Sequence, residues 1–110
     1  MKKAPTYWAN IYVGLRWRHS CFGTSRIENI CQKYVDRAGL CVTVTPTKFI
    51  YTDGNEVGAI VGLINYARFP STPRAILKHA KALAQALKKD LGQERVTIMT
   101  ANESILLGAK

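Results

Sequence analysis

The side chains best suited to chemistry lie near the start of the chain, where aromatic and guanidinium groups alternate with apolar residues. From residue 8 to residue 18 the odd positions are apolar, and the even positions include Trp8, Tyr12, Arg16 and Arg18. Because successive strand side chains point to opposite faces, one face of such a strand would join a core and the other would display these four groups. Aromatic rings stack on bases and guanidinium groups pair with phosphates. The pattern therefore predicts a binding face for nucleic acid or an anionic nucleotide.

The densest cationic and aromatic cluster follows directly, in Arg16-Trp-Arg-His19. A guanidinium group can hold a phosphate through two parallel hydrogen bonds and can stack on a base. We therefore expect this loop, including His19, to contact an anionic ligand, with Arg95 of a later strand beside it. The alternative is that Trp17 packs in the core and the arginines are only solvated.

Residues for catalysis or metal binding do not gather in the sequence. His19 and His79 are the two histidines, and neither lies in a His-x-Thr or His-x-Ser motif. His19 and Cys21 are spaced as two metal ligands on one loop, but two further ligands are not evident. Glu28 is accounted for by helix capping and Asp53 by a turn. The sequence thus predicts a non-enzymatic protein with no metal and no cofactor.

Length and charge restrict the class of protein. A chain of 110 residues suits a single domain spanning 1–110. Its 16 basic residues outnumber 7 acidic ones, and the formal net charge of +9 attracts polyanions.

Three cysteines without a Cys-x-x-Cys pair indicate reduced thiols, so a cytoplasmic location is expected. The Met1-Lys-Lys start is followed by no apolar stretch long enough for a signal peptide or membrane helix, so no membrane association is expected.

Periodicity predicts two helices. Ser25 and Glu28 form a capping box, an apolar stripe at three- and four-residue spacing runs from Ile27 to Ala38, and Gly39 is placed to end the helix. Thr72 and Pro73 begin a second helix as N-cap and first residue, and Gly92 ends it.

Strands are predicted at 8–18, 40–51, 57–66 and 95–100, and residues 105–107 are placed to add a short hairpin strand. Pro46 favours an edge position for the second strand, and Thr52-Asp-Gly-Asn55 supplies turn residues. The order strand, helix, strand, strand, helix, strand predicts an α+β ferredoxin-like split βαβ fold. Its four-stranded antiparallel sheet would have both helices on one face and strands one and three in the centre.

Two resemblances add to this prediction. Ile11-Tyr-Val-Gly-Leu15 resembles the first-strand motif of RNA-recognition domains, which implies base stacking on Tyr12. The third strand, Gly58 to Ile64, lacks the aromatic residues of the companion motif. The long strands around the hairpin are similar to those of trimeric CutA and PII-type proteins. That resemblance implies sheets that pack together, with small anionic ligands or metals between subunits.

We therefore predict a basic protein that binds single-stranded nucleic acid or another polyanion. The predicted contact residues are Trp8, Tyr12, Arg16, Arg18, His19 and Arg95. One alternative is a homo-oligomer that binds or sequesters a small anionic nucleotide between subunits. Another is a virus-encoded protein-interaction or inhibitor module.

Overall fold

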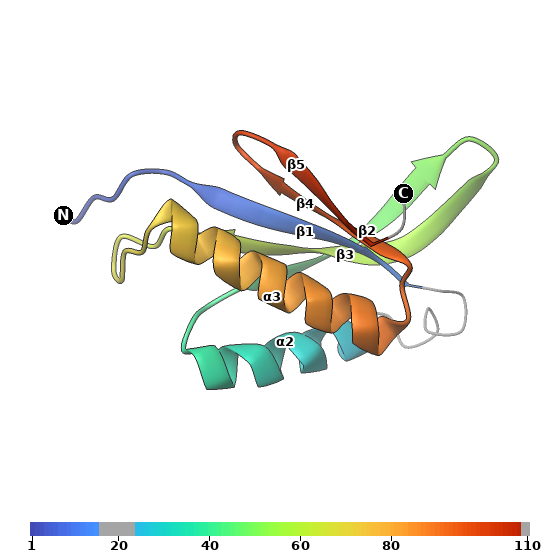
Figure 1. The fold of residues 1–110 in the computed structure, drawn as a ribbon, viewed down its shortest axis with the longest axis horizontal. Coiled ribbons are helices and arrows are strands. Elements are labelled where there is room, and N and C mark those ends of the chain that lie inside the picture. Colours follow the sequence, from blue (N-terminus) through green and yellow to red (C-terminus); the bar gives the residue numbers. More distant parts are fainter. Residues whose placement is uncertain (16–23, 109–110) are drawn as a thin grey trace.

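A computed structural model describes residues 1–15 and 24–108. The elements in chain order are β1 (Trp8–Gly14), α2 (Ser25–Ala38), β2 (Thr43–Tyr51), β3 (Gly54–Ile64), α3 (Pro73–Leu91), β4 (Arg95–Thr100) and β5 (Ser104–Gly108). The described part is thus an α+β structure whose strands form an antiparallel sheet, with both helices on one side of it (Figure 1).

The sheet has five strands in the order β2-β3-β1-β4-β5. The predicted central position of the first and third strands is confirmed, but the predicted number of four strands is wrong. Residues 101–103 turn the chain back, and the Thr100 amide donates a 2.8 Å hydrogen bond to the Glu103 carbonyl. β5 therefore pairs along β4, from Met99 with Ser104 to Arg95 with Gly108, and β4 is no longer an edge strand.

The core lies between the helices and one face of the sheet. Ile11, Val61 and Ile98 contribute from the three central strands, and Leu83 and Leu87 contribute from α3; all five are fully buried. The alternation of buried and partly exposed residues along β1 shows the two-residue period of a strand with one covered face. The other face is left to carry different side chains.

Both helices begin and end where local chemistry favours it, with one correction. Thr72 caps α3 through a 3.1 Å hydrogen bond that its hydroxyl accepts from the Ala75 amide. Gly39 and Gly92 end the helices in the left-handed conformation. The predicted capping box at Ser25 is wrong, because Ser25 is already helical and the N-cap is Thr24, whose side chain makes no capping hydrogen bond. No helix in 1–15 and 24–108 is long and apolar enough to cross a membrane.

The β2–β3 hairpin extends past the end of the helix layer (Figure 1). β2 is an edge strand, so Pro46 removes no hydrogen bond that an inner strand would need. The turn lies at Thr52 and Asp53, and the positive φ of 67° falls on Asp53 rather than on Gly54 as the turn sequence suggested. Aspartate tolerates this conformation better than most residues with a Cβ atom.

Candidate ligand site on the open sheet face

The face of the sheet opposite the helices, here called the open face, combines apolar, aromatic and glycine positions. Strand parity and register place on it Trp8 and Tyr12 of β1, Ile60 and Ile64 of β3, Met99 of β4 and Leu106 of β5. Exposure confirms this for Ile64, Met99 and Leu106, which are 49%, 37% and 47% exposed. Large apolar groups left exposed on one contiguous face mark a surface used for binding.

Three of the six predicted contact residues can be placed, and all three lie on the open face. Trp8 pairs with Ile64, and Tyr12 pairs with Ile60 and Thr97. Arg95 is two residues before Thr97 in β4, so its side chain is on the same face of the sheet. The Tyr12 hydroxyl lies 3.9 Å from the Met99 sulfur. Arg16, Arg18 and His19 lie outside the described residues, so their role stays a prediction.

The acidic side chain on this sheet face was not among the predicted contact residues. All seven acidic residues are described, and Glu56 is the only one within a strand. It follows the turn on β3, pairs with Phe49 of β2, and has the parity of Gly58 and Ile60. The available signal was a charged residue directly before a run of apolar and glycine residues, Val57 to Ile64.

The Glu56 carboxylate lies flat over Gly14 of the neighbouring strand. A Cβ atom built on Gly14 would be 2.6 Å from Cδ and Oε1 and 2.7 Å from Oε2 of Glu56. Near-equal distances to all three atoms mean that the plane of the carboxylate covers the glycine. The Phe49 ring lies over Gly58 in a similar manner, because its Cε2 atom is 2.7 Å from the position that a Cβ atom would take on Gly58. The Glu56 carboxylate and the Phe49 ring therefore lie side by side, close to the backbone of the two glycines.

Distances along the strands decide which other groups a single ligand can reach. Tyr12 is two residues from Gly14, roughly 7 Å away, whereas Trp8 is six residues away, roughly 20 Å. The β1–β4 register pairs Tyr12 with Thr97, and two further residues bring Arg95 beside Gly14. A ligand held at Glu56 can thus meet Tyr12 and Arg95, and Trp8 belongs to a different part of the face.

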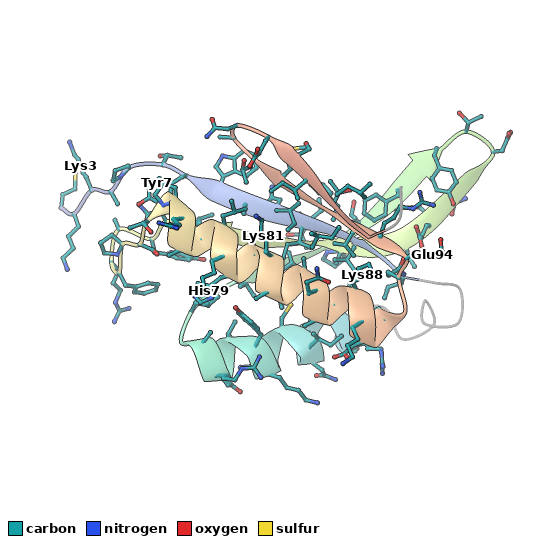
Figure 2. The ribbon with its side chains drawn as sticks, in the orientation of Figure 1. Lys3, Tyr7, His79, Lys81, Lys88 and Glu94 are labelled. Atoms are coloured by element: carbon teal, nitrogen blue, oxygen red, sulfur yellow. The ribbon has the colours of Figure 1, made fainter. Side chains whose placement is uncertain are left out.

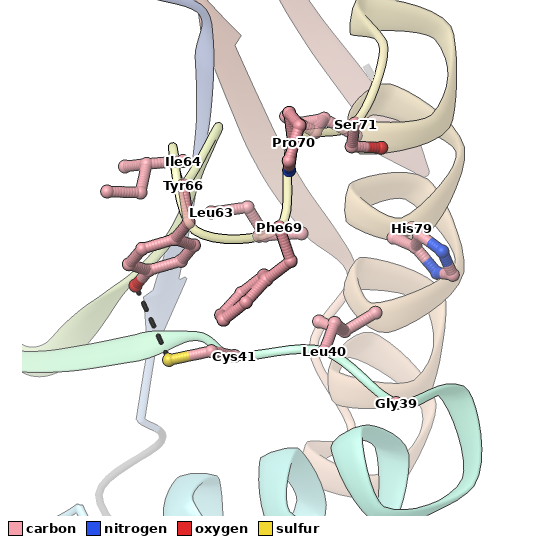
Figure 3. Close-up of a pocket in the computed structure, with 11 residues that line it drawn as sticks. Gly39, Leu40, Cys41, Leu63, Ile64, Tyr66, Phe69, Pro70, Ser71 and His79 are labelled. Carbon is pink, nitrogen blue, oxygen red and sulfur yellow. Dashed lines mark hydrogen bonds between the residues drawn. The ribbon is translucent and has the colours of Figure 1, made fainter. Parts of the chain in front are cut away.

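A cavity lies on the helix side of the sheet (Figure 3). It has a volume of about 270 Å³ and lies at the end of β3, against the segment that joins α2 to β2. Its lining residues are Gly39, Leu40, Cys41, Leu63, Ile64, Tyr66, Phe69, Pro70, Ser71, Ile76 and His79.

The cavity is lined by aromatic and apolar side chains together with small polar ones. The Tyr66 and Phe69 rings are 5.3 Å apart, and the Cys41 thiol donates to the Tyr66 hydroxyl at 3.4 Å, which raises the pKa of Tyr66. The described lining contains no Lys, Arg, Asp or Glu. Ile64 is eight residues from Glu56, roughly 27 Å along β3, so one nucleoside cannot occupy both places.

The histidine of the helix layer is accounted for by packing. His79 of α3 faces α2 (Figure 2), and its Nδ1 lies 2.9 Å from the Tyr34 hydroxyl. Burial raises the pKa of Tyr34, and the nearby Arg37 guanidinium opposes that rise. Within residues 1–15 and 24–108 no group of three or more His, Cys, Asp or Glu is arranged to hold a metal ion.

Comparison with known proteins gives a structural match without a sequence match. No family model matches the chain, and no curated protein matches it. A phage S-adenosylmethionine (SAM) lyase in complex with S-methyl-5'-thioadenosine (MTA) superposes with a TM-score of 0.80 at 15% identity, over 99% of this chain and 94% of that one. A phage SAM lyase in the apo state superposes with a TM-score of 0.75 at 18% identity, over 100% of this chain and 96% of that one.

The chain shares its fold with phage SAM lyases. This finding contradicts the predicted non-enzymatic protein that binds nucleic acid, because both neighbours are enzymes and one holds a small nucleoside. The physical reason for the error is that aromatic rings stack equally well on the base of a single nucleoside and on the bases of a polymer. A net charge of +9 likewise describes the whole surface and not the groups at one site.

Proposed function

We propose that this protein binds SAM on the open face and cleaves the bond between its sulfonium sulfur and the amino acid chain, releasing MTA. The observation that carries the proposal is the Glu56 carboxylate, lying over Gly14 beside aromatic rings. Support comes from the fold, which matches a SAM lyase over nearly the full length of both chains.

A carboxylate at the site offsets the repulsion between a cationic substrate and a cationic protein. SAM carries a sulfonium, an ammonium and a carboxylate, so its net charge at neutral pH is +1, and the protein's formal charge is +9. At about 4 Å an opposite charge contributes about 1 kcal/mol in water and about 4 kcal/mol at the effective dielectric of a protein surface. Glu56 is half-buried, so its contribution falls between these limits and is enough to attract the substrate locally.

The chemistry of the step decides which cationic group Glu56 holds. When the C–S bond breaks, its electron pair goes to sulfur and the sulfonium becomes a neutral thioether. A carboxylate against the sulfur would stabilise the substrate more than the transition state and slow this step. We therefore assign Glu56 to the substrate ammonium, and Arg95, which the register brings beside Gly14, to orienting the substrate carboxylate.

The atoms balance without water or an oxidant. An oxygen of the substrate carboxylate forms a bond to Cγ as the C–S bond breaks, closing a five-membered lactone. The products are neutral MTA and a lactone that keeps the ammonium charge. Two opposite charges disappear in this step, so a site poor in water speeds it. The apolar open face supplies such an environment once it is covered.

The aromatic residues near Glu56 are suited to bind the adenine end of the substrate. Phe49 lies in the same row as Glu56, and Tyr12 is roughly 7 Å from Gly14. Stacking of a base on an aromatic ring contributes about 1 to 3 kcal/mol. We propose that adenine packs between these two rings, across the floor formed by Gly58.

We further propose that strands β2-β3-β1-β4 form a ferredoxin-like unit extended by β5, and that a second copy covers the open face. The exposed Ile64, Met99 and Leu106 on that face support self-association. Light scattering after gel filtration tests it, with Leu106→Lys compared with Ala82→Lys on the exposed side of α3. We expect an oligomer that Leu106→Lys dissociates and Ala82→Lys does not. A monomeric wild-type protein would contradict the proposal.

The proposed reaction is tested by incubating the purified protein with SAM and measuring MTA by mass spectrometry. S-adenosylhomocysteine, which lacks the sulfonium, is the substrate control. We expect MTA to form well above the rate in buffer, and Glu56→Gln to reduce that rate while Asp36→Asn on α2 leaves it unchanged. The Asp36 carboxylate only accepts a 2.8 Å hydrogen bond from Gln32, so its replacement controls for the change in net charge. MTA formation at the buffer rate would refute the function.

A further inference from the structure

We infer that Gly14 is a positioning residue: its missing side chain is what allows the Glu56 carboxylate to lie flat on the sheet. As a statement about substrate binding, this rests on the function proposed above. As a statement about the carboxylate, it rests on geometry alone.

The backbone does not require glycine at position 14. Gly14 is not among the residues with positive φ, so its conformation is open to residues with a Cβ atom. The three heavy atoms nearest to a Cβ at this position all belong to the Glu56 carboxylate, at 2.6 to 2.7 Å. The space left empty by Gly14 is therefore occupied by the functional group itself.

Gly58 provides the contrast. A Cβ atom there would collide with the Val13 carbonyl oxygen of the backbone, and with the Phe49 ring at 2.7 Å. Backbone cannot move aside without disturbing the β1–β3 ladder, so Gly58 is required by the fold. At Gly14 the obstacle is the end of a flexible side chain, which can rotate away at low cost. An alanine at position 14 is thus expected to leave the fold intact and to displace the carboxylate.

A matched glycine on the same face gives the control. A Cβ atom at Gly62 would meet the hydroxyl of Thr43 at 2.7 Å and the amide oxygen of Asn10 at 3.2 Å. Gly62→Ala therefore makes a similar steric change on the same sheet without touching a carboxylate. If it folds less well than wild type, Asp36→Asn in an unaltered sheet serves as the second reference.

The first experiment measures the carboxylate directly. The carboxyl chemical shift of Glu56 is measured by carbon-detected NMR at neutral pH in the wild type, Gly14→Ala and Gly62→Ala, with urea unfolding to confirm stability. We expect the Glu56 carboxyl chemical shift to change in Gly14→Ala and to stay at the wild-type value in Gly62→Ala. An unchanged Glu56 resonance in a folded Gly14→Ala protein would overturn the inference, whether or not the protein cleaves SAM.

The second experiment is a double-mutant cycle on binding of the stable aza analogue of SAM, in which a protonated nitrogen replaces the sulfonium. We expect Gly14→Ala to weaken binding about fivefold or more, and to have no further effect when Glu56→Gln is already present. Equal losses from Gly14→Ala in both backgrounds would mean that it acts independently of Glu56, and would overturn the inference. No binding of the analogue by the wild type would refute the proposed function, and the NMR result would still decide the role of Gly14.

Discussion

The sharpest prediction concerns the charge of Glu56 and the difference between substrate and product. Glu56→Gln keeps the size of the side chain and removes its negative charge. SAM and its aza analogue carry an ammonium and a second positive charge, whereas MTA is neutral. The substitution should therefore weaken binding of the charged ligand and leave binding of MTA nearly unchanged.

The magnitude follows from the position of Glu56. A contact at about 4 Å contributes about 1 to 4 kcal/mol between the limits of water and a protein surface. Glu56 is half-buried on an open face, so solvent screening places the loss at about 1 to 2 kcal/mol, or about 5- to 30-fold in affinity. The loss should shrink at high salt.

Isothermal titration with the aza analogue and with MTA measures the two affinities in the wild type, Glu56→Gln and the Asp36→Asn control. We expect a loss confined to the charged ligand and to Glu56→Gln. Equal weakening of both ligands would show that Glu56 supports the site through shape and not through charge, and would refute the assignment to the ammonium.

Three further predictions concern the scaffold. Leu83 is fully buried, so Leu83→Ala should lower the free energy of unfolding by about 2 to 5 kcal/mol in urea titrations, and a loss below 1 kcal/mol would contradict the described core. Thr72→Ala should lower the free energy of unfolding by about 1 kcal/mol, because it removes the hydroxyl that accepts a hydrogen bond from the Ala75 amide. Thr24→Ala should lower it by less, because the Thr24 side chain makes no capping hydrogen bond. Equal losses in the two variants would refute this explanation. Burial, and to a smaller extent the nearby Glu28 charge, raises the pKa of Cys31 to about 11. At pH 8 iodoacetamide should therefore modify the exposed Cys41 before Cys31. Labelling of Cys31 should become faster as the pH approaches 11. Peptide mass spectrometry measures both rates, and early labelling of Cys31 in the folded protein would show that it is not buried.

Elements with a strong local signal were predicted well from the sequence. β4 has the predicted bounds, Arg95 to Thr100, and Thr72, Pro73 and Gly92 bound the second helix as expected. These signals are local: a cap, a ring-fixed φ and a residue free to adopt positive φ act within a few positions. The N-cap of α2 was missed by one residue because Thr24 and Ser25 are both acceptable caps, and only the packing of the helix selects between them.

The binding face was predicted in part and its function was not. Alternation along β1 correctly placed Trp8 and Tyr12 on the uncovered side of the sheet. Composition then favoured a polymer of nucleotides, because a high positive charge reports on the whole chain and not on one surface. The fold shared with phage SAM lyases was invisible at 15 to 18% identity, since many sequences satisfy the same pattern of buried and exposed positions.

The sequence by itself determined the two helices, the approximate positions of the strands and the face that β1 turns to the core, because these follow from periodicity and from chemistry within a few residues. Only the tertiary structure decided that Glu56 of β3 lies over Gly14 of β1, 42 positions earlier in the chain, with Phe49 beside it. Such neighbours are set by the register of three strands, and that register depends on how the whole apolar face packs against the helices. The local pattern predicts a surface, and the strand register determines which groups on it can act together.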